Sequence, residues 1–323
     1  MHCVNATSTC VVIVNWNGWR DTVVCLESLL ALEGGPMHVI VCDNASTDGS
    51  VAELHGWLRE RLPSRPMSGQ GTDIRSAAGE GAVLSVHVLP LPSNLGYAGG
   101  LNAGIRWARE RWSPGGFWLL NNDVQAQPRA LDALLAAHAA TPDAGICGSI
   151  LLDWEEPRRI QAVAGIYSRW LGVGWHERKV PAGSDAVSMA LDYPVGASLY
   201  VSSEYLDRVG LMDASYFLYY EEMDWVERGR RHGYRPLVAL GSRLRHKEGA
   251  STGSHGGVRN KSLLSEHYGV INRLRITRKF WPHYLPIVWL SLFAVALDRF
   301  VNREWDRAGL VLRLMASPLR WLR

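Results

Sequence analysis

Apolar runs of strand length alternate with helical patterns along most of the chain. The runs at 10–14, 37–42, 83–89 and 117–120 each end in a polar loop. Windows with apolar residues at helical spacing separate them, and this order favours parallel strands joined by right-handed crossovers. Further strands are predicted at 144–152, 195–201 and 237–240. Helices are predicted at 21–32, 51–61, 129–140, 204–209 and 221–232, and another follows the loop 94–104 and runs through Arg109. The pattern predicts an α/β fold with a mostly parallel central sheet flanked by helices.

Two stretches show no periodicity. Residues 62–82 are rich in Pro, Gly and Ser, which predicts a flexible surface insertion. Residues 153–192 scatter aromatic side chains among glycines and charges, so we predict irregular structure there. Those aromatic side chains could form an acceptor-binding wall or simply pack into the core.

The C-terminal part is apolar and basic. A basic helix is predicted at 262–279, and the apolar stretch 284–297 is shorter than the ~20 residues that span a bilayer. With tryptophans nearby and a basic tail, this part could lie at a membrane interface, pack on the preceding domain or form a dimer contact. We therefore expect a main domain at 1–260 and a helical C-terminal extension at 261–323.

The charge, the cysteines and the N-terminus of the chain argue against several classes of protein. The 323 residues carry a formal net charge of only +3 with mixed signs, which argues against a nucleic-acid binder. The five cysteines are odd in number and form no CxxC pair, as expected for reduced thiols. The short polar N-terminus lacks the apolar core of a signal peptide, so we expect a cytoplasmic protein, with peripheral contact to the inner face of the cell membrane as one possibility.

The strand 117–120 ends in Asn121, Asn122 and Asp123. The carboxyl edge of an open α/β sheet is where such folds bind ligands. A carboxylate there can hold a divalent cation together with nucleotide phosphates. All three residues are also common turn formers, so a plain turn is the alternative.

A second cluster, Glu221, Glu222 and Asp224, follows an aromatic run and opens a helix. Acidic residues at this position can complement the helix dipole. A carboxylate beside an apolar wall can instead have a raised pKa and act as a general base. Further along, His246 lies among Gly and Ser and could bind a metal or diphosphate, or be an ordinary surface residue.

The glycines of the loop 94–104 let backbone approach a ligand or a neighbouring helix. This loop is not the GxGxxG of dinucleotide binding, which disfavours a dehydrogenase.

In their order along the chain, these loops resemble the family 2 glycosyltransferases with the GT-A fold, particularly the bacterial rhamnosyltransferase-like branch. The residues that carry the resemblance lie at 14–18, 41–50, 94–102, 120–123, 196–197, 210–224 and 246–251. They cover roughly residues 10 to 255, and the tail after Ser262 also looks like that branch, less distinctly.

The resemblance implies a nucleotide-sugar donor, Mg²⁺ or Mn²⁺, and inversion at the anomeric carbon. It implies metal binding by Asp123 and His246, and makes Glu222 the expected base, with Glu221 and Asp224 as alternatives. The residues that it implies for nucleotide-sugar binding are Val14, Asn15, Asn17, Asp43, Asn44, Asn94, Gly96, Gly99, Asn102, Asn121 and Asn122.

We hypothesise transfer of L-rhamnose from dTDP-rhamnose, or of another sugar from a dTDP- or UDP-sugar, to a polysaccharide or lipid-linked glycan acceptor, as in cell wall polysaccharide biosynthesis. A sugar nucleotidyltransferase is one alternative, although residues 15–20 are poor in the glycines and basic side chains that its triphosphate loop needs. A non-catalytic nucleotide or glycan binder is another. Asn121 and Asn122 stand where stricter members have acids, and Glu222 stands where Asp is usual.

Overall fold

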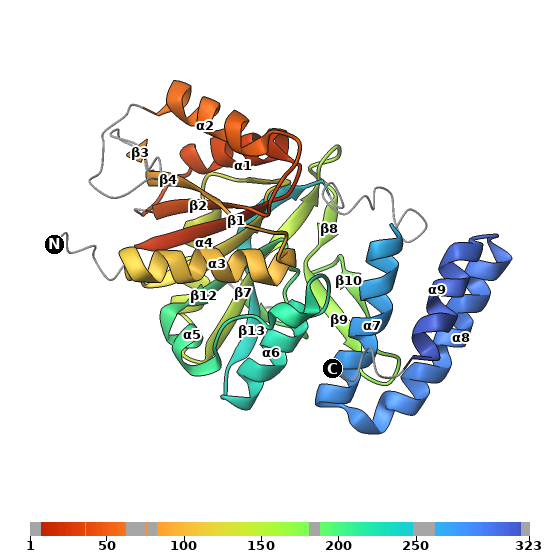
Figure 1. Ribbon diagram of the computed structural model, residues 1–323. Helices are drawn as coiled ribbons and strands as arrows, with labels where there is room; N and C mark the ends of the chain where they lie inside the picture. The colour runs from red at the N-terminus through yellow and green to blue at the C-terminus, as the bar shows by residue number, and fades with distance from the viewer. Residues whose placement is uncertain are drawn as a thin grey trace.

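The computed structural model describes residues 8–35, 37–62, 75–76, 83–180, 188–247 and 262–317, and shows a large sheet with helices on both faces (Figure 1). The strands are β1 (Thr9–Asn15), β2 (Met37–Asp43), β3 (Arg75–Ser76), β4 (Val83–Pro90), β5 (Gly116–Asn121), β6 (Val124–Ala126), β7 (Ala144–Asp153), β8 (Ile160–Ala162), β9 (Ala164–Ser168), β10 (Val173–Glu177), β11 (Ser188–Ala190), β12 (Ser198–Ser202) and β13 (Arg235–His246). The helices are α1 (Trp19–Leu30), α2 (Ser50–Arg61), α3 (Gly96–Arg111), α4 (Ala130–Ala139), α5 (Ser203–Val209), the 3₁₀ turn η1 (Ala214–Tyr216), α6 (Glu221–Arg231), α7 (Leu263–Phe280), the 3₁₀ turn η3 (Pro282–Tyr284), α8 (Leu285–Val301) and α9 (Trp305–Met315).

The α/β fold class, with a large central sheet flanked by helices, is confirmed, and the sheet contains antiparallel strands besides the parallel ones. Its order is β11-β13-β7-β12-β5-β1-β2-β4-β3, with β6 on β13 and β8 on β7. Parallel pairing joins β4, β2, β1 and β5, and also β7 with β13. Strand β12 runs antiparallel to both β5 and β7. Since the parallel strands end at one edge, the polar loops after β1, β2 and β5 meet there.

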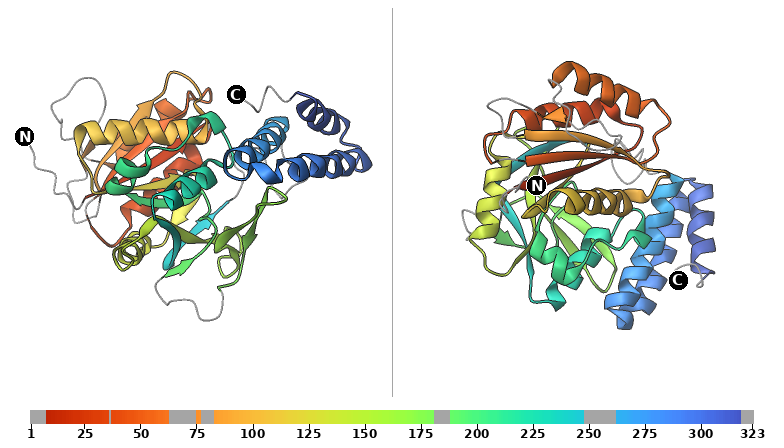
Figure 2. Two further views of the ribbon diagram at one scale, coloured as in Figure 1. Left: turned by 90° about the horizontal axis from the view of Figure 1, so that it is seen from below. Right: turned by 60° about the vertical axis from the view of Figure 1, so that its left-hand side comes forward.

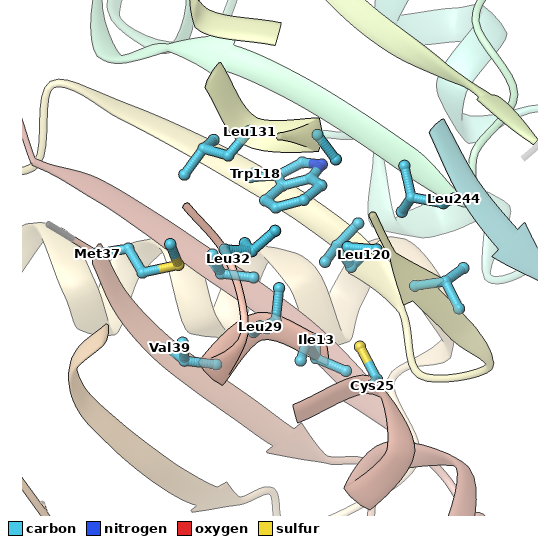
Figure 3. Close-up of a cluster of buried hydrophobic side chains, with 14 of the residues drawn as sticks. Ile13, Cys25, Leu29, Leu32, Met37, Val39, Trp118, Leu120, Leu131 and Leu244 are labelled. Atoms are coloured by element: carbon cyan, nitrogen blue, oxygen red, sulfur yellow. The ribbon is translucent and has the colours of Figure 1, made fainter. Parts of the chain in front are cut away.

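Alternate side chains of the central strands feed two cores. Val11 and Ile13 of β1 pack with α1, α2 and α4, whereas Cys10 and Val12 pack with α3, α5 and α6. Trp118 lies at the centre of the first core (Figure 3). A strand covered on both faces must be apolar at every position, which explains the unbroken hydrophobic runs.

Two sequence expectations about local structure are wrong. The stretch predicted to be irregular contains the short strands β8 to β11, of which β9 and β10 form an antiparallel pair. These strands are only three to five residues long, and β10 is largely exposed, so they show no long buried apolar run. The strand predicted at 237–240 extends to His246, because its second half pairs with β6 and β7. The insertion predicted at 62–82 lies largely outside the described residues.

Helices α7, α8 and α9 form a layer beside the sheet domain (Figure 2). The apolar stretch is longer than the sequence suggested. Within the described residues one helical stretch, Pro282–Val301, is long and apolar enough to cross a membrane, and 22% of it is buried. Asp298 and Arg299 do not end it, because Arg299 turns inward and pairs with Glu266 of α7 at 3.1 Å. The division at residue 260 stays a prediction.

Candidate active site

A cleft of about 990 Å³ opens at the carboxyl edge of β1, β2 and β5 and extends to α7 and α8. Many of the residues singled out in the sequence line it, on opposite sides of one space. These are Val14, Asn44, Asn94, Gly96, Asn121, Asn122, Asp123, Glu221, Glu222 and His246. The others do not line it and are Asn15, Asn17, Asp43, Gly99, Asn102 and Asp224.

A buried network ties the loops after β1, β2 and β5 together. Asn15 Nδ2 donates to Asp43 Oδ1 at 2.7 Å, and Asn15 Oδ1 accepts from the Thr22 hydroxyl at 2.8 Å. Asn122 Nδ2 donates to the carbonyl oxygen of Gly18 at 3.2 Å and to the Thr22 hydroxyl at 3.1 Å. Asn15 and Asp43 therefore hold the loops in place around the cleft.

Asn44 orients the start of α3. Its Nδ2 donates to the Gly96 carbonyl oxygen at 2.9 Å, and its Oδ1 accepts from the Leu95 amide at 3.1 Å. Asn94 Oδ1 accepts from the Gly96 amide at 2.9 Å. The remaining polar candidates have structural contacts, since Asn17 accepts from the Thr47 amide and Asn102 donates to the Met212 carbonyl oxygen.

Asp123 and His246 meet because β6 pairs with β13, with His246 opposite Val124. His246 Nε2 lies 3.4 Å from Asp123 Oδ1, and both side chains are buried and line the cleft. The other ring nitrogen, Nδ1, lies 2.7 Å from Gln161 Oε1. An Nδ1–H donated to this amide oxygen leaves the Nε2 lone pair facing Asp123, as in many metal-binding histidines.

This pair fits a divalent cation that is completed by substrate. The described residues contain no group of three or more His, Cys, Asp or Glu that could hold a metal. Mg²⁺ and Mn²⁺ are commonly bound through one or two protein ligands plus substrate phosphates. A carboxylate and an imidazole at the cleft wall are a suitable partial set.

Glu221 and Glu222 begin α6 and both line the cleft. Burial raises the pKa of Glu222 to about 7. Burial, and secondarily the charge of Glu222, raises the pKa of Glu221 well above its usual range. Of the two carboxyls, Glu222 is therefore better suited to serve as a general base near neutral pH.

Asp224 differs from its two neighbours. Its fully buried carboxylate contacts Arg228 at 2.7 Å, Lys279 at 2.5 Å and the Tyr216 hydroxyl at 3.2 Å. These partners turn it away from the cleft, so the structure does not bring this candidate base to the site.

Several cleft residues were missed by the sequence reasoning. Tyr97 donates its hydroxyl to the Gly196 carbonyl oxygen at 2.5 Å, and Trp16, His176 and Tyr193 also line the cleft. Tyr97 and Trp16 stand inside motifs that carried the resemblance, His176 comes from the stretch predicted to be irregular, and Tyr193 follows directly after that stretch. Of the scattered aromatic residues considered for an acceptor wall, Tyr167 is buried in the core and Trp170 is exposed.

Residues 10–181, more than half of the chain, match the family described as glycosyl transferase family 2. The chain belongs to this family. It is therefore a glycosyltransferase, and the resemblance noted in the sequence is confirmed. The N-acetylglucosaminyl-diphospho-decaprenol L-rhamnosyltransferase of Mycobacterium tuberculosis is 26% identical over 275 residues, covering 76% of this chain and 80% of the relative. The low-salt glycan biosynthesis hexosyltransferase Agl10 of Haloferax volcanii is 23% identical, covering 68% and 61%.

Solved glycosyltransferase structures share the fold. GalNAc-T7 with UDP, GalNAc and Mn²⁺ gives a TM-score of 0.62 at 13% identity, covering 91% of this chain but only 51% of its own. This chain thus spans about half the length of that enzyme. The mannosyltransferase PcManGT of Pyrobaculum calidifontis, in complex with GDP-Man and Mn²⁺, gives 0.55 at 15% identity, covering 96% and 86%. These similarities establish the GT-A fold.

Proposed function

We propose that this glycosyltransferase is metal-dependent and inverts the configuration of the sugar that it transfers from a nucleotide-sugar donor. The observation that carries the proposal is the placement of Asp123 and His246 in one cleft with Glu221 and Glu222. The first pair suits the donor diphosphate, and the second suits an acceptor hydroxyl.

The reaction follows from these positions. Glu222 takes the proton from the acceptor hydroxyl as its oxygen attacks the anomeric carbon. The bond from that carbon to the diphosphate oxygen breaks, and the leaving group keeps the electron pair. A single displacement inverts the anomeric centre. Residues Asp123 and His246 would hold the cation, which when bound neutralises charge developing on the diphosphate.

The substrates are proposed from the relatives. The mycobacterial relative is named for rhamnosyl transfer to a diphospho-lipid acceptor. We propose a dTDP-linked deoxyhexose, with L-rhamnose as the first choice, and a lipid-linked glycan acceptor. This assignment places the enzyme in the cytoplasm and in polysaccharide assembly.

A lipid-linked acceptor requires access to a membrane, and α8 offers a surface for it. Leu290, Phe293, Leu297 and Val301 are 50–71% exposed and repeat every three or four residues, so they share one face of the helix. An exposed apolar face of this size marks an interaction site. We propose that it rests in the membrane interface.

The proposed function is tested by release of nucleoside diphosphate from a panel of dTDP-, UDP- and GDP-sugars. Each donor is assayed with Mg²⁺, Mn²⁺ or EDTA, with and without a GlcNAc-diphospho-lipid acceptor. We expect turnover of one donor that EDTA abolishes, and an inverted linkage in the product by NMR. Metal-independent turnover would contradict the cation proposal. Nucleotide binding without turnover across the panel would favour a non-catalytic binder.

Membrane contact has its own test, flotation with vesicles of phosphatidylethanolamine and phosphatidylglycerol. The wild type should float, and the double variant Leu290→Glu/Leu297→Glu should not. Leu312→Glu on α9, where Leu312 is 47% exposed, is the matched control and should float. A wild type that stays at the bottom of the gradient would refute this contact.

A further inference from the structure

The backbone just before the two cleft glutamates is strained. Phe217, Tyr219 and Tyr220 have φ angles of 62°, 68° and 72°, in the left-handed region. Bulky side chains rarely adopt this region. Such a conformation is unfavourable and persists only where its surroundings impose it. Something must therefore hold this loop, residues 217–220.

Asn272 of α7 reaches this loop from the C-terminal part of the chain. Its side chain is fully buried, and its Nδ2 donates to three backbone carbonyl oxygens, those of Tyr216 at 2.7 Å, Leu218 at 2.8 Å and Tyr219 at 3.2 Å. A carboxamide has two N–H groups. Its whole donor capacity is thus spent on the segment that leads into Glu221.

Arg275, one turn further along α7, sets the orientation of this amide. Its Nη1 donates to Asn272 Oδ1 at 3.2 Å and to the Ser215 carbonyl oxygen at 2.5 Å. With Oδ1 facing a guanidinium, the NH₂ group must face the loop, so the hydrogen-bond network defines which way the amide points.

Two other contacts hold the ends of the loop. The Tyr97 amide donates to the Phe217 carbonyl oxygen at 2.8 Å, and the Tyr220 hydroxyl donates to the Gly172 carbonyl oxygen at 3.0 Å. Gly96 allows the first approach, because a Cβ there would lie 2.3 Å from the same Phe217 oxygen. Asn272 acts between these two ends, on the middle of the loop.

We propose that Asn272 is a positioning residue for the transfer reaction. It holds the strained loop in the conformation that aims Glu222 into the cleft. This inference rests on the proposed function, in which Glu222 is the base. It also assigns a catalytic task to a helix outside residues 10–181, the part that matches the family.

The test compares Asn272→Ala and Asn272→Asp with Leu274→Ala. The aspartate keeps the size of the side chain but turns acceptor oxygens toward three carbonyls, and it serves if the alanine variant does not fold. Leu274 is a buried residue of the same helix that packs against α8 and α9, so its truncation loosens the helix bundle without removing a contact to the loop. Two readouts are needed, hydrogen exchange of the peptide 217–222 and steady-state kinetics with the donor found in the panel.

We expect exchange at least about tenfold faster in both Asn272 variants and not in Leu274→Ala. We also expect kcat to fall roughly 10- to 100-fold with donor KM within twofold, since a displacement near 1 Å can cost that much in rate. Unchanged exchange would overturn the inference, as would faster exchange with the kcat of the control. Hydrogen exchange does not depend on turnover. A wild type that is inactive on every donor would count against the proposed function, and the exchange rates would still decide whether Asn272 holds the loop.

Discussion

The two groups of loops that face each other across the cleft are held in different ways. Around Asn15 and Asp43, short polar side chains satisfy one another within the loops after β1, β2 and β5. Before Glu221, the loop is strained and is held through its carbonyl oxygens by α7. The first group supports itself, whereas the second depends on a distant part of the chain. The donor side is therefore held by contacts within its own loops, whereas the side of the base relies on the packing of α7.

Removal of the base should have the largest effect. We expect Glu222→Gln to lower kcat by about 10²–10⁴, the usual contribution of a general base. Glu221→Gln, the matched change one residue away, should cost less, because burial and the charge of Glu222 raise the pKa of Glu221 and disfavour its ionised form. Steady-state kinetics at pH 7.5 measure both. A larger loss in Glu221→Gln would reverse the assignment.

On the opposite side of the cleft, Asp123→Asn should lower kcat/KM by roughly 10²–10³, because a bound cation contributes several kcal/mol to charge stabilisation. The Mn²⁺ concentration for half-maximal activity should rise in Asp123→Asn and in His246→Gln. Asp207→Asn removes an exposed carboxylate that pairs with Arg109 and serves as the control. An unchanged Mn²⁺ dependence in both cleft variants would refute the metal site.

The dependence of kcat on pH tests the role of Glu222. With a pKa of about 7 for Glu222, its ionised fraction rises about tenfold between pH 6 and pH 8. We expect kcat to rise by a similar factor over that range, and Glu222→Gln to show a flat profile. The two carboxyls interact, so the measured value belongs to the pair. A wild-type rate independent of pH would contradict a base with this pKa.

The raised pKa of Glu222 should also make the stability of the fold depend on pH, in the opposite direction to its effect on kcat. A carboxyl whose pKa is raised by folding stabilises the fold below its unfolded pKa, and this contribution is lost as pH rises through about 7. Glu222→Gln removes the penalty of ionising a buried group. We expect its Tm to exceed that of the wild type at pH 8, on the order of 2–4 °C, and the gap to close by pH 5. Thermal melts at both pH values test this, and an equal gap at both would contradict it.

The smallest effect is expected in the scaffold of the donor side. Asn15→Ala removes two buried hydrogen bonds, to Asp43 Oδ1 and from the Thr22 hydroxyl, so the free energy of unfolding should drop by about 1–3 kcal/mol. Asn94→Ala, which removes one local contact to the Gly96 amide, should cost less. Denaturant melts measure both. Equal losses would mean that the network around Asn15 is no more important than a single turn.

The sequence predicted the strands and loops on the donor side of the cleft better than the contacts on the side of the base. The strands that end at the cleft are covered on both faces, so their apolar runs were visible, and the loops that follow them form contacts between neighbouring strands. The strands β8 to β11 are short, and the partners of Asn272 lie more than 50 positions away. No local pattern signals such contacts. Asp224 was indistinguishable from Glu222 in the sequence, since only the fold reveals Lys279 beside it.

The irregular pairing in β13 decides which residue reaches Asp123. Between Ala239 and Arg243, β13 advances four residues while β7 advances one, and the pairing then resumes to His246. Because neighbouring side chains of a strand point to opposite faces, a shift of one residue would place Arg245 opposite Val124 in place of His246. The side chain that faces Asp123 therefore depends on the number of residues in this part of β13. One inserted residue in that short stretch would bring Arg245 to the position of His246, and one deleted residue would bring Lys247, so that either change replaces a potential cation ligand with a cation.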